Sequence, residues 1–196
     1  MEKYLGKDDK FIDHLERLAK CQACSIHFTG QHRCPGLGNL DAEVMFIGEA
    51  PGEVDNPDLR ELPFVGNRSS DLMMDIIYGL WPHGYDDIFI TNIVKCNPPQ
   101  NRTPTEKEVK LCSCWLREEL KIVQPKVIVA LGRTAANFFG IEESLNNARF
   151  KDYLWEGKIL FVLPHPAYAL RNGPRAVEQY KQLFKRVKRC LEVKQN

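Results

Sequence analysis

Cysteine spacing is the first feature of this 196-residue sequence that suggests chemistry. Cys21 and Cys24 form a C-x-x-C pair, and Cys96 and Cys112 are joined by a proline-rich turn and a predicted helix. Four thiolates from two distant segments could bind one metal centre. A second C-x-x-C pair is absent, which leaves zinc and an iron–sulfur cluster both open. The alternative is that these cysteines are small buried side chains.

Polar residues at three predicted strand ends form a second group of candidates. The apolar run Val44 to Ile47 predicts a strand buried on both faces, which Gly48 ends. About twenty residues rich in glycine, proline and carboxylates follow, and such a loop after a parallel strand is a common seat of ligand sites. Asn92 and His165 end two further strands. Asparagine and histidine can also serve purely structural purposes at such positions.

Strands that alternate with helices must position these residues. Apolar spacing and capping signals predict helices over residues 11–20, 72–80, 104–123 and 174–193, a short helix after Gly132, and strands over residues 44–47, 87–95, 126–131 and 159–163. Two helices have predicted caps: a capping box over Thr103, Pro104, Thr105 and Glu106, with proline at the first helical position, and a cap at Ser69 or Ser70. Residues 141–156 are expected to form an irregular surface excursion. This order predicts a mainly parallel sheet covered on both sides.

Composition limits the class of protein. The chain is 43% hydrophobic, so one domain over residues 1–196 is the expectation. We expect no membrane segment, because no apolar run approaches the roughly 20 residues that a membrane helix needs. The N-terminus lacks a signal peptide, which predicts a cytoplasmic protein whose seven cysteines favour metal or reactive thiols over disulfides. A net charge of +1 requires any nucleic-acid partner to meet a local patch.

Several motifs, taken in order, resemble one known family. CQAC, GEAPG, PFVG, TNIVKCNPPQNRTPTEKEVKLC, LGRTAA and HPAYALRN are similar to the motifs of family 4 uracil-DNA glycosylases, the iron–sulfur type, over residues 21–172. The resemblance implies an α/β three-layer sandwich with a central four-stranded parallel sheet. It also implies hydrolysis of the bond between uracil and deoxyribose, with no metal in the chemistry. The expected partner is uracil-containing DNA, bound by a monomer.

The resemblance also implies one structural 4Fe-4S cluster. Its ligands map onto two pairs of cysteines, Cys21 and Cys24, and Cys96 and Cys112. The remaining cysteines, Cys34, Cys114 and Cys190, fall outside the pattern of the family.

Two residues are the predicted catalytic groups. Cleavage builds negative charge on the leaving base and positive charge on the sugar, so a preorganised donor and a positioned water are needed. His165 resembles the family histidine that donates to uracil O2. Asp55, counted forward from Gly52, matches the acid that orients the water. The loop is about two residues longer than the family pattern, which leaves Asp55, Asp58 and Glu61 as alternatives for this acid.

The substrate-binding residues follow from the same motifs. Asn92 resembles the residue that reads the amide edge of uracil, because a carboxamide can donate to a carbonyl oxygen and accept from the ring N–H. Phe64 resembles the aromatic residue that stacks on the flipped base. Glu49 resembles the glutamate near uracil C5 that excludes the thymine methyl group. Ala50 and Gly52 of GEAPG complete the predicted binding loop.

DNA contacts are predicted at arginines and at the HPAYALR segment. Arg68, Arg102 and Arg171 could meet phosphates. HPAYALR is expected to form a loop that enters the duplex where the base has left, with Tyr168 or Leu170 as the apolar wedge. The basic residues of the last helix are interpreted as a solvated face. Two alternatives stay open: a glycosylase for another deaminated base, and a non-catalytic iron–sulfur protein that binds nucleic acid.

Overall fold

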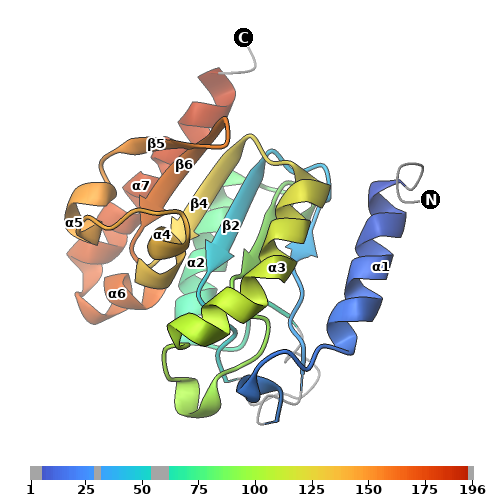
Figure 1. Ribbon diagram of the computed structural model, residues 1–196. Helices are drawn as coiled ribbons and strands as arrows, with labels where there is room; N and C mark the ends of the chain where they lie inside the picture. The colour runs from blue at the N-terminus through green and yellow to red at the C-terminus, as the bar shows by residue number, and fades with distance from the viewer. Residues whose placement is uncertain (1–5, 29–31, 54–61, 194–196) are drawn as a thin grey trace.

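The computed structural model describes residues 6–28, 32–53 and 62–193. This part of the chain forms a six-stranded sheet in the order β1-β3-β2-β4-β6-β5, with helices on both faces (Figure 1). The strands are β1 (Leu37–Gly38), β2 (Val44–Gly48), β3 (Phe89–Asn92), β4 (Val127–Leu131), β5 (Asp152–Trp155) and β6 (Lys158–Leu163). The α-helices are α1 (Lys7–Ala19), α2 (Arg68–Leu80), α3 (Glu106–Val123), α4 (Arg133–Phe138), α5 (Leu145–Ala148), α6 (Pro166–Arg171) and α7 (Pro174–Val193).

The four central strands of the sheet are parallel. Strand β2 pairs with β3 and β4, and β4 pairs with β6, all in the parallel sense. The short strands β1 and β5 add antiparallel edges. The two residues between β5 and β6, Glu156 and Gly157, both have positive φ, the conformation of a tight hairpin turn. The predicted four-stranded parallel core is therefore confirmed, and the two edge strands are additions to it.

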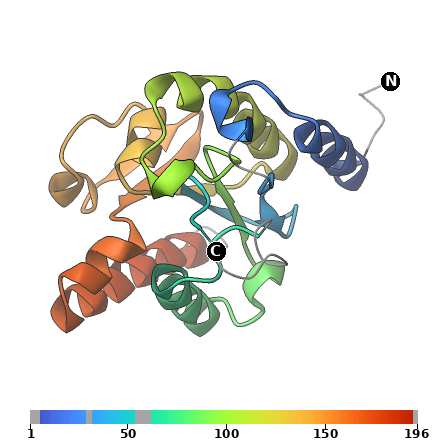
Figure 2. The same ribbon diagram turned by 90° about the horizontal axis from the view of Figure 1, so that it is seen from below.

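Helices cover the sheet in two layers. Figures 1 and 2 show α1, α3 and α4 on one face of the sheet and α2, α6 and α7 on the other. Alternate residues of β2 pack into two hydrophobic cores, one on each face of the sheet. Met45 and Ile47 pack in the core beneath α3 and α4, whereas Val44 and Phe46 pack in the core beneath α2 and α7. Every residue of β2 is buried, which confirms the prediction of a strand covered on both faces.

The structure corrects both predicted helix caps. The capping box was predicted over Thr103 to Glu106, but it lies two residues further along the chain. At α3 the Thr105 hydroxyl accepts from the Glu108 N–H at 3.3 Å, and the Thr105 N–H donates to the Glu108 carboxylate at 2.7 Å, as in a capping box. At α2 the predicted cap was wrong. Asn67 is the N-cap, and its side-chain oxygen accepts from the N–H groups of Ser69 and Ser70 at 3.1 and 3.0 Å. The two serines belong to the first helical turn.

Three segments differ from their predictions. Residues 141–156 contain α5 and β5 instead of irregular chain, and the exposure of Leu154 hid the edge strand from an argument based on burial. The predicted HPAYALR loop is helix α6, because the His165 ring accepts from the Ala167 N–H and Pro166 occupies the first helical position. Of the predicted strand over residues 87–95, only Phe89–Asn92 forms a β-strand, which is β3.

No helix within the described ranges is both long and apolar enough to cross a membrane.

Candidate functional site

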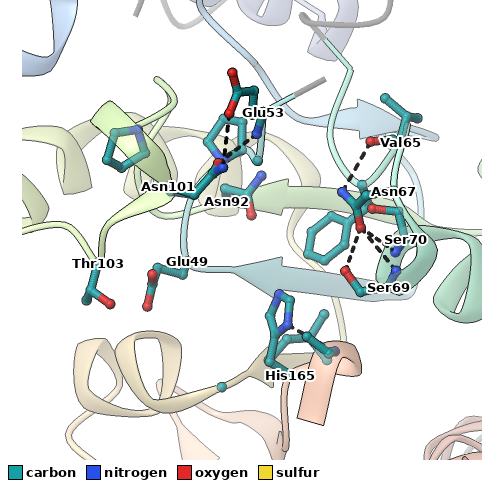
Figure 3. A pocket seen from close by; sticks show the side chains of 18 of the residues that line it. Glu49, Glu53, Val65, Asn67, Ser69, Ser70, Asn92, Asn101, Thr103 and His165 are labelled. Carbon is teal, nitrogen blue, oxygen red and sulfur yellow. Dashed lines mark hydrogen bonds between the residues drawn. The ribbon is translucent and has the colours of Figure 1, made fainter. Parts of the chain in front are cut away.

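A cavity of about 580 Å³ opens at the carboxyl ends of the parallel strands (Figure 3). Because parallel strands present these ends at the same edge, residues that follow β2, β3, β4 and β6 meet there. The lining includes eight of the predicted site residues: Glu49, Ala50, Gly52, Phe64, Asn92, Arg102, His165 and Arg171. The cavity therefore unites residues more than 100 positions apart in the chain.

Gly48 makes room for two side chains of the cavity. A Cβ atom at Gly48 would lie 2.4 Å from Asn92 Oδ1 and 2.5 Å from the tip of the Phe64 ring. Such distances are shorter than van der Waals contact allows, so a larger residue at the end of β2 would displace both side chains from these positions. Phe64 has a φ of +55°, which is rare for an aromatic residue and marks a constrained loop.

The carboxamide of Asn92 is available to bind a ligand in the cavity. Asn92 is 2% exposed at the end of β3, and its side chain makes no hydrogen bond to another residue in the described part of the chain. Its amide atoms are not among the fully enclosed polar atoms that lack a partner, because they face the open cavity. The side chain lines the cavity, so a ligand that offers both a donor and an acceptor would satisfy it.

His165 presents one ring nitrogen to the cavity as a donor. Its Nδ1 accepts from the Ala167 N–H at 3.3 Å, which requires the proton of the neutral ring to be on Nε2. Burial and the charge of Arg171 both lower the pKa of His165 below its ordinary value. The ring is therefore neutral at pH 7. Its plane is 28° from that of Phe64, with ring centroids 6.5 Å apart.

Thr134 holds the carboxylate of Glu49 at the cavity. The Thr134 hydroxyl, in the first turn of α4, donates a short hydrogen bond to Glu49 Oε2. The backbone of Glu49 is also fixed, because its carbonyl accepts from the Val94 N–H at 3.0 Å. Sequence reasoning missed Thr134, although it lies in the LGRTAA motif directly after a predicted strand end.

Asn101 ties the glycine-rich loop to the proline-rich turn. Its Oδ1 accepts from the Glu53 N–H at 2.8 Å (Figure 3). The same oxygen accepts from Asn97 Nδ2 at 2.9 Å. Asn97 Nδ2 also donates to the Pro51 carbonyl at 2.9 Å. Asn101 has a φ of +53°, a conformation that asparagine tolerates well. Its pattern in the sequence, N-P-P-Q-N, suggested only a turn, so its place in the cavity wall was missed.

The predicted arginines differ in their environments. Arg102 donates two hydrogen bonds to Glu108, at 2.7 and 2.8 Å, so its charge is already paired. Arg171 lines the cavity, is exposed, and makes no ion pair with any residue in the described ranges. Arg68 is exposed at the start of α2 but does not line the cavity. Of the three predicted arginines, Arg171 is thus the one that lines the cavity with its charge unpaired.

Other predicted residues lie apart from the cavity. Tyr168 and Leu170 are on α6 but do not line it, and Tyr168 is 38% exposed. Asp55, the predicted acid, lies outside the described residues, as do Asp58 and Glu61.

The four predicted cluster cysteines lie near one another. Cys21 follows α1, Cys24 precedes a 3₁₀ turn, Cys96 follows β3, and Cys112 lies in α3. Burial raises the pKa of Cys96 to about 11, and the neighbouring thiols of Cys24 and Cys21 add to the rise, although Arg33 opposes it.

The pKa of Cys112 is raised for the same reason. Burial raises its pKa to about 12, with contributions from Cys96 and Cys24, while the Lys95 N–H donates to its sulfur at 3.3 Å. Within the described residues, no three histidine, cysteine or acidic side chains converge tightly enough for one metal ion. A multi-iron cluster holds its sulfur ligands further apart than a single ion does. This soft donor set, with Cys96 and Cys112 buried and Cys21 and Cys24 half-buried, fits such a cluster.

A buried polar network fixes the segments that carry these cysteines. Lys95 Nζ donates to Glu119 Oε2 at 2.6 Å and to Thr91 Oγ1 at 2.5 Å. Glu119 also accepts from the Gly36 N–H at 2.9 Å, and His14 Nε2 lies 3.4 Å from it. Burial alone would raise the pKa of Glu119, but Lys95 and His14 hold that pKa well below its ordinary value. The network connects α1, α3 and β3.

Known proteins show first which superfamily and then which family this chain is similar to. Residues 35–188 match the family model of the uracil DNA glycosylase superfamily. Relatives named type-4 uracil-DNA glycosylase include one from Saccharolobus solfataricus, 39% identical over 93% of this chain and 89% of the relative. Another, from Thermotoga maritima, is 41% identical over 80% and 81%, and one from Archaeoglobus fulgidus is 36% identical over 89% and 90%. The chain belongs to the type-4 uracil-DNA glycosylases of this superfamily.

Proposed function

We propose that this protein removes uracil from DNA by hydrolysing the bond between the base and deoxyribose, which leaves an abasic site. One observation carries the proposal: the cavity is lined by a carboxamide that bonds to no other side chain in the described ranges, an aromatic ring and a neutral imidazole donor, contributed by Asn92, Phe64 and His165. A cavity of about 580 Å³ has room for a base and its sugar.

Base recognition is the first step of the mechanism. Phe64 stacks on the flipped uracil, an interaction worth about 1–3 kcal/mol per base. Asn92 donates to a uracil oxygen and accepts from the ring N–H. Cytosine reverses the donor pattern at that edge and would leave the buried amide mispaired, at a cost of about 1–3 kcal/mol. Glu49, held by Thr134, stands near C5 and excludes the thymine methyl group.

His165 acts on the charge of the leaving base. The Nε2 proton of its neutral ring donates to uracil O2 as negative charge develops there. The helix cap fixes the ring before the reaction, so little reorganisation is needed. We propose that Asp55 orients the attacking water and stabilises the positive sugar, while the free charge of Arg171 meets a DNA phosphate.

We propose that Cys21, Cys24, Cys96 and Cys112 hold one 4Fe-4S cluster. When bound, the cluster supplies a structural crosslink among α1, the β3 end and α3 and takes no part in hydrolysis. Cluster binding requires deprotonated cysteines, and the positive iron offsets the burial that raises the pKa of Cys96 and Cys112. We also propose that residues 1–196 form one domain that works as a monomer in the cytoplasm.

Iron analysis tests the cluster. Cys112→Ser should abolish the yellow-brown colour and lower the iron content from about four per chain to near zero, because loss of one ligand destabilises the whole site. Cys114→Ser is the matched control, since Cys114 is exposed on the same helix. Stoichiometric zinc in anaerobically purified protein would overturn the assignment.

Base release under single-turnover conditions tests the reaction. Duplexes that carry uracil, hypoxanthine, thymine or cytosine should yield free uracil only. Asn92→Ala should slow uracil release by about 5- to 150-fold, the equivalent of 1–3 kcal/mol, whereas the exposed Asn146→Ala should not. Faster release of hypoxanthine would reassign the substrate. DNA binding without any base release would instead indicate a non-catalytic protein.

A further inference from the structure

A second cavity, of about 210 Å³, lies on the other side of α6 from the first. Ala167 and Arg171 of α6 line the first cavity, whereas Tyr168 and Ala169 of the same helix line the second. The helix is thus a wall shared by two cavities. Its opposite boundary is α7, whose Tyr180 contributes to the lining.

Two buried polar atoms at this second cavity lack partners. The Tyr180 hydroxyl and Arg149 Nε are both buried and make no hydrogen bond within the described part of the chain. Tyr180 is only 2% exposed, and burial raises its pKa well above the ordinary value, so the hydroxyl stays protonated. An unsatisfied buried donor is costly and calls for an explanation. A ligand that accepts hydrogen bonds would provide one.

The charged residues that line this second cavity favour an anion as its ligand. Arg149 and Arg175 both line the cavity, and the residues that line it include no carboxylate. Neither arginine forms an ion pair with any residue in the described ranges. The Arg149 guanidinium rests 4.8 Å from the centroid of the Phe150 ring, which holds it in place without neutralising it. Arginine forks of this kind match the geometry of phosphate oxygens.

We infer that this second cavity binds a backbone phosphate of the DNA, on the far side of α6 from the flipped nucleotide. The inference rests on the proposed function. A helix is about 10–12 Å across. One DNA strand carries a phosphate about every 3.4 Å along the axis, so the phosphate in question lies about three nucleotides from the uracil. The site would set the register of the strand without reading its sequence.

Tyr180→Phe is the most discriminating variant. It keeps the ring and its packing against Phe184, at 5.0 Å between centroids, and removes only the hydroxyl. Because that hydroxyl has no partner in the free protein, its removal should leave the melting temperature unchanged or raised. Affinity for uracil DNA should nevertheless fall by about 10- to 150-fold, through loss of a hydrogen bond to a charged group.

Arg175→Gln tests the charge. It should weaken DNA binding and reduce the slope of log Kd against log salt by about one counterion. Lys181→Gln is the matched control, because Lys181 is exposed on the same helix and does not line the cavity. Equal effects of the two variants would show only a general basic surface and would overturn the inference.

A neutral-linkage scan locates the phosphate. Single methylphosphonates are placed at successive positions around the uracil, and binding is measured for wild type and Tyr180→Phe. A neutral linkage at one position about three nucleotides away should weaken DNA binding by the wild type and have no further effect on binding by the variant.

The contrary outcomes are distinguishable. If no position has this effect and the wild type releases uracil, this inference is overturned and the proposed function stands. A wild type that releases no uracil overturns the proposed function instead. Stabilisation by inorganic phosphate alone, with no sensitive linkage, would reassign the cavity to a free anion and overturn the DNA assignment.

Discussion

Thr91 and Asn92 are neighbours in β3, both almost fully buried, and their polar groups have opposite surroundings. Because successive residues of a strand point to opposite faces, Thr91 joins the network of Lys95 and Glu119, whereas Asn92 lines the cavity without a partner. On the network side, Thr91, Lys95 and Glu119 bond to one another, which serves stability. On the cavity side, the Asn92 carboxamide faces open space, where a ligand can pair with it.

The largest expected effect comes from breaking the network. Glu119→Gln leaves the Lys95 charge buried and uncompensated, which should cost about 3–5 kcal/mol of folding free energy. For a chain of this size that corresponds to a fall in melting temperature of at least about 6 °C. Thermal unfolding with parallel iron analysis measures it. Glu43→Gln, which removes a surface ion pair with Lys126, should cost only about 0–1 kcal/mol. Equal losses in the two variants would contradict a structural role for the network.

Gly48→Ala should act on the cavity side instead. The added Cβ must displace Asn92 Oδ1 and the Phe64 ring, at a cost of about 1–3 kcal/mol. Both groups are the far ends of side chains, so the variant should fold and lose most of its excision rate. In Gly79→Ala, an added Cβ meets no atom within 4 Å, and this helix variant should remain active and at least as stable. Full excision activity in Gly48→Ala would show that catalysis does not require the Phe64 ring and the Asn92 carboxamide at their present positions.

The smallest expected effect concerns pH. Burial first, and then Arg171, lower the pKa of His165, so the neutral ring and excision should persist below pH 6.5 before acid abolishes them. Arg171→Gln removes only the lesser cause. The acid limb of single-turnover excision should therefore move to slightly higher pH but stay below 6.5. Arg189→Gln, on exposed α7 surface, should not move it. An acid limb shifted downward in Arg171→Gln would contradict this electrostatic assignment.

The sequence predicted the cavity better than the network. Strand ends of parallel β2, β3 and β6 must share an edge, so the meeting of Glu49, Asn92 and His165 followed from topology. Lysine and glutamate are usually exposed, so nothing in the sequence indicated that Lys95 and Glu119 are fully buried as a pair. Such a pair depends on side chains from different elements, which local patterns do not reveal.

Local patterns also missed features where two signals competed. Two serines after Asn67 looked like helix caps, but the longer asparagine side chain reaches both of their N–H groups. Thr134 followed a strand end like the predicted site residues, yet its partner Glu49 lies 85 positions away. The edge strand β5 escaped because only one of its faces is covered and Leu154 is 80% exposed.

Single-turnover uracil excision by His165→Ala tests the central claim most directly. Loss of the donor to the developing uracil anion should slow excision by about 100- to 1000-fold, the equivalent of 2.7–4 kcal/mol, while affinity for uracil DNA changes little. His83→Ala, which truncates an exposed histidine, is the control and should match wild type. If His165→Ala excises uracil within about threefold of the wild-type rate, a loss of well under 1 kcal/mol, the assigned chemistry is wrong.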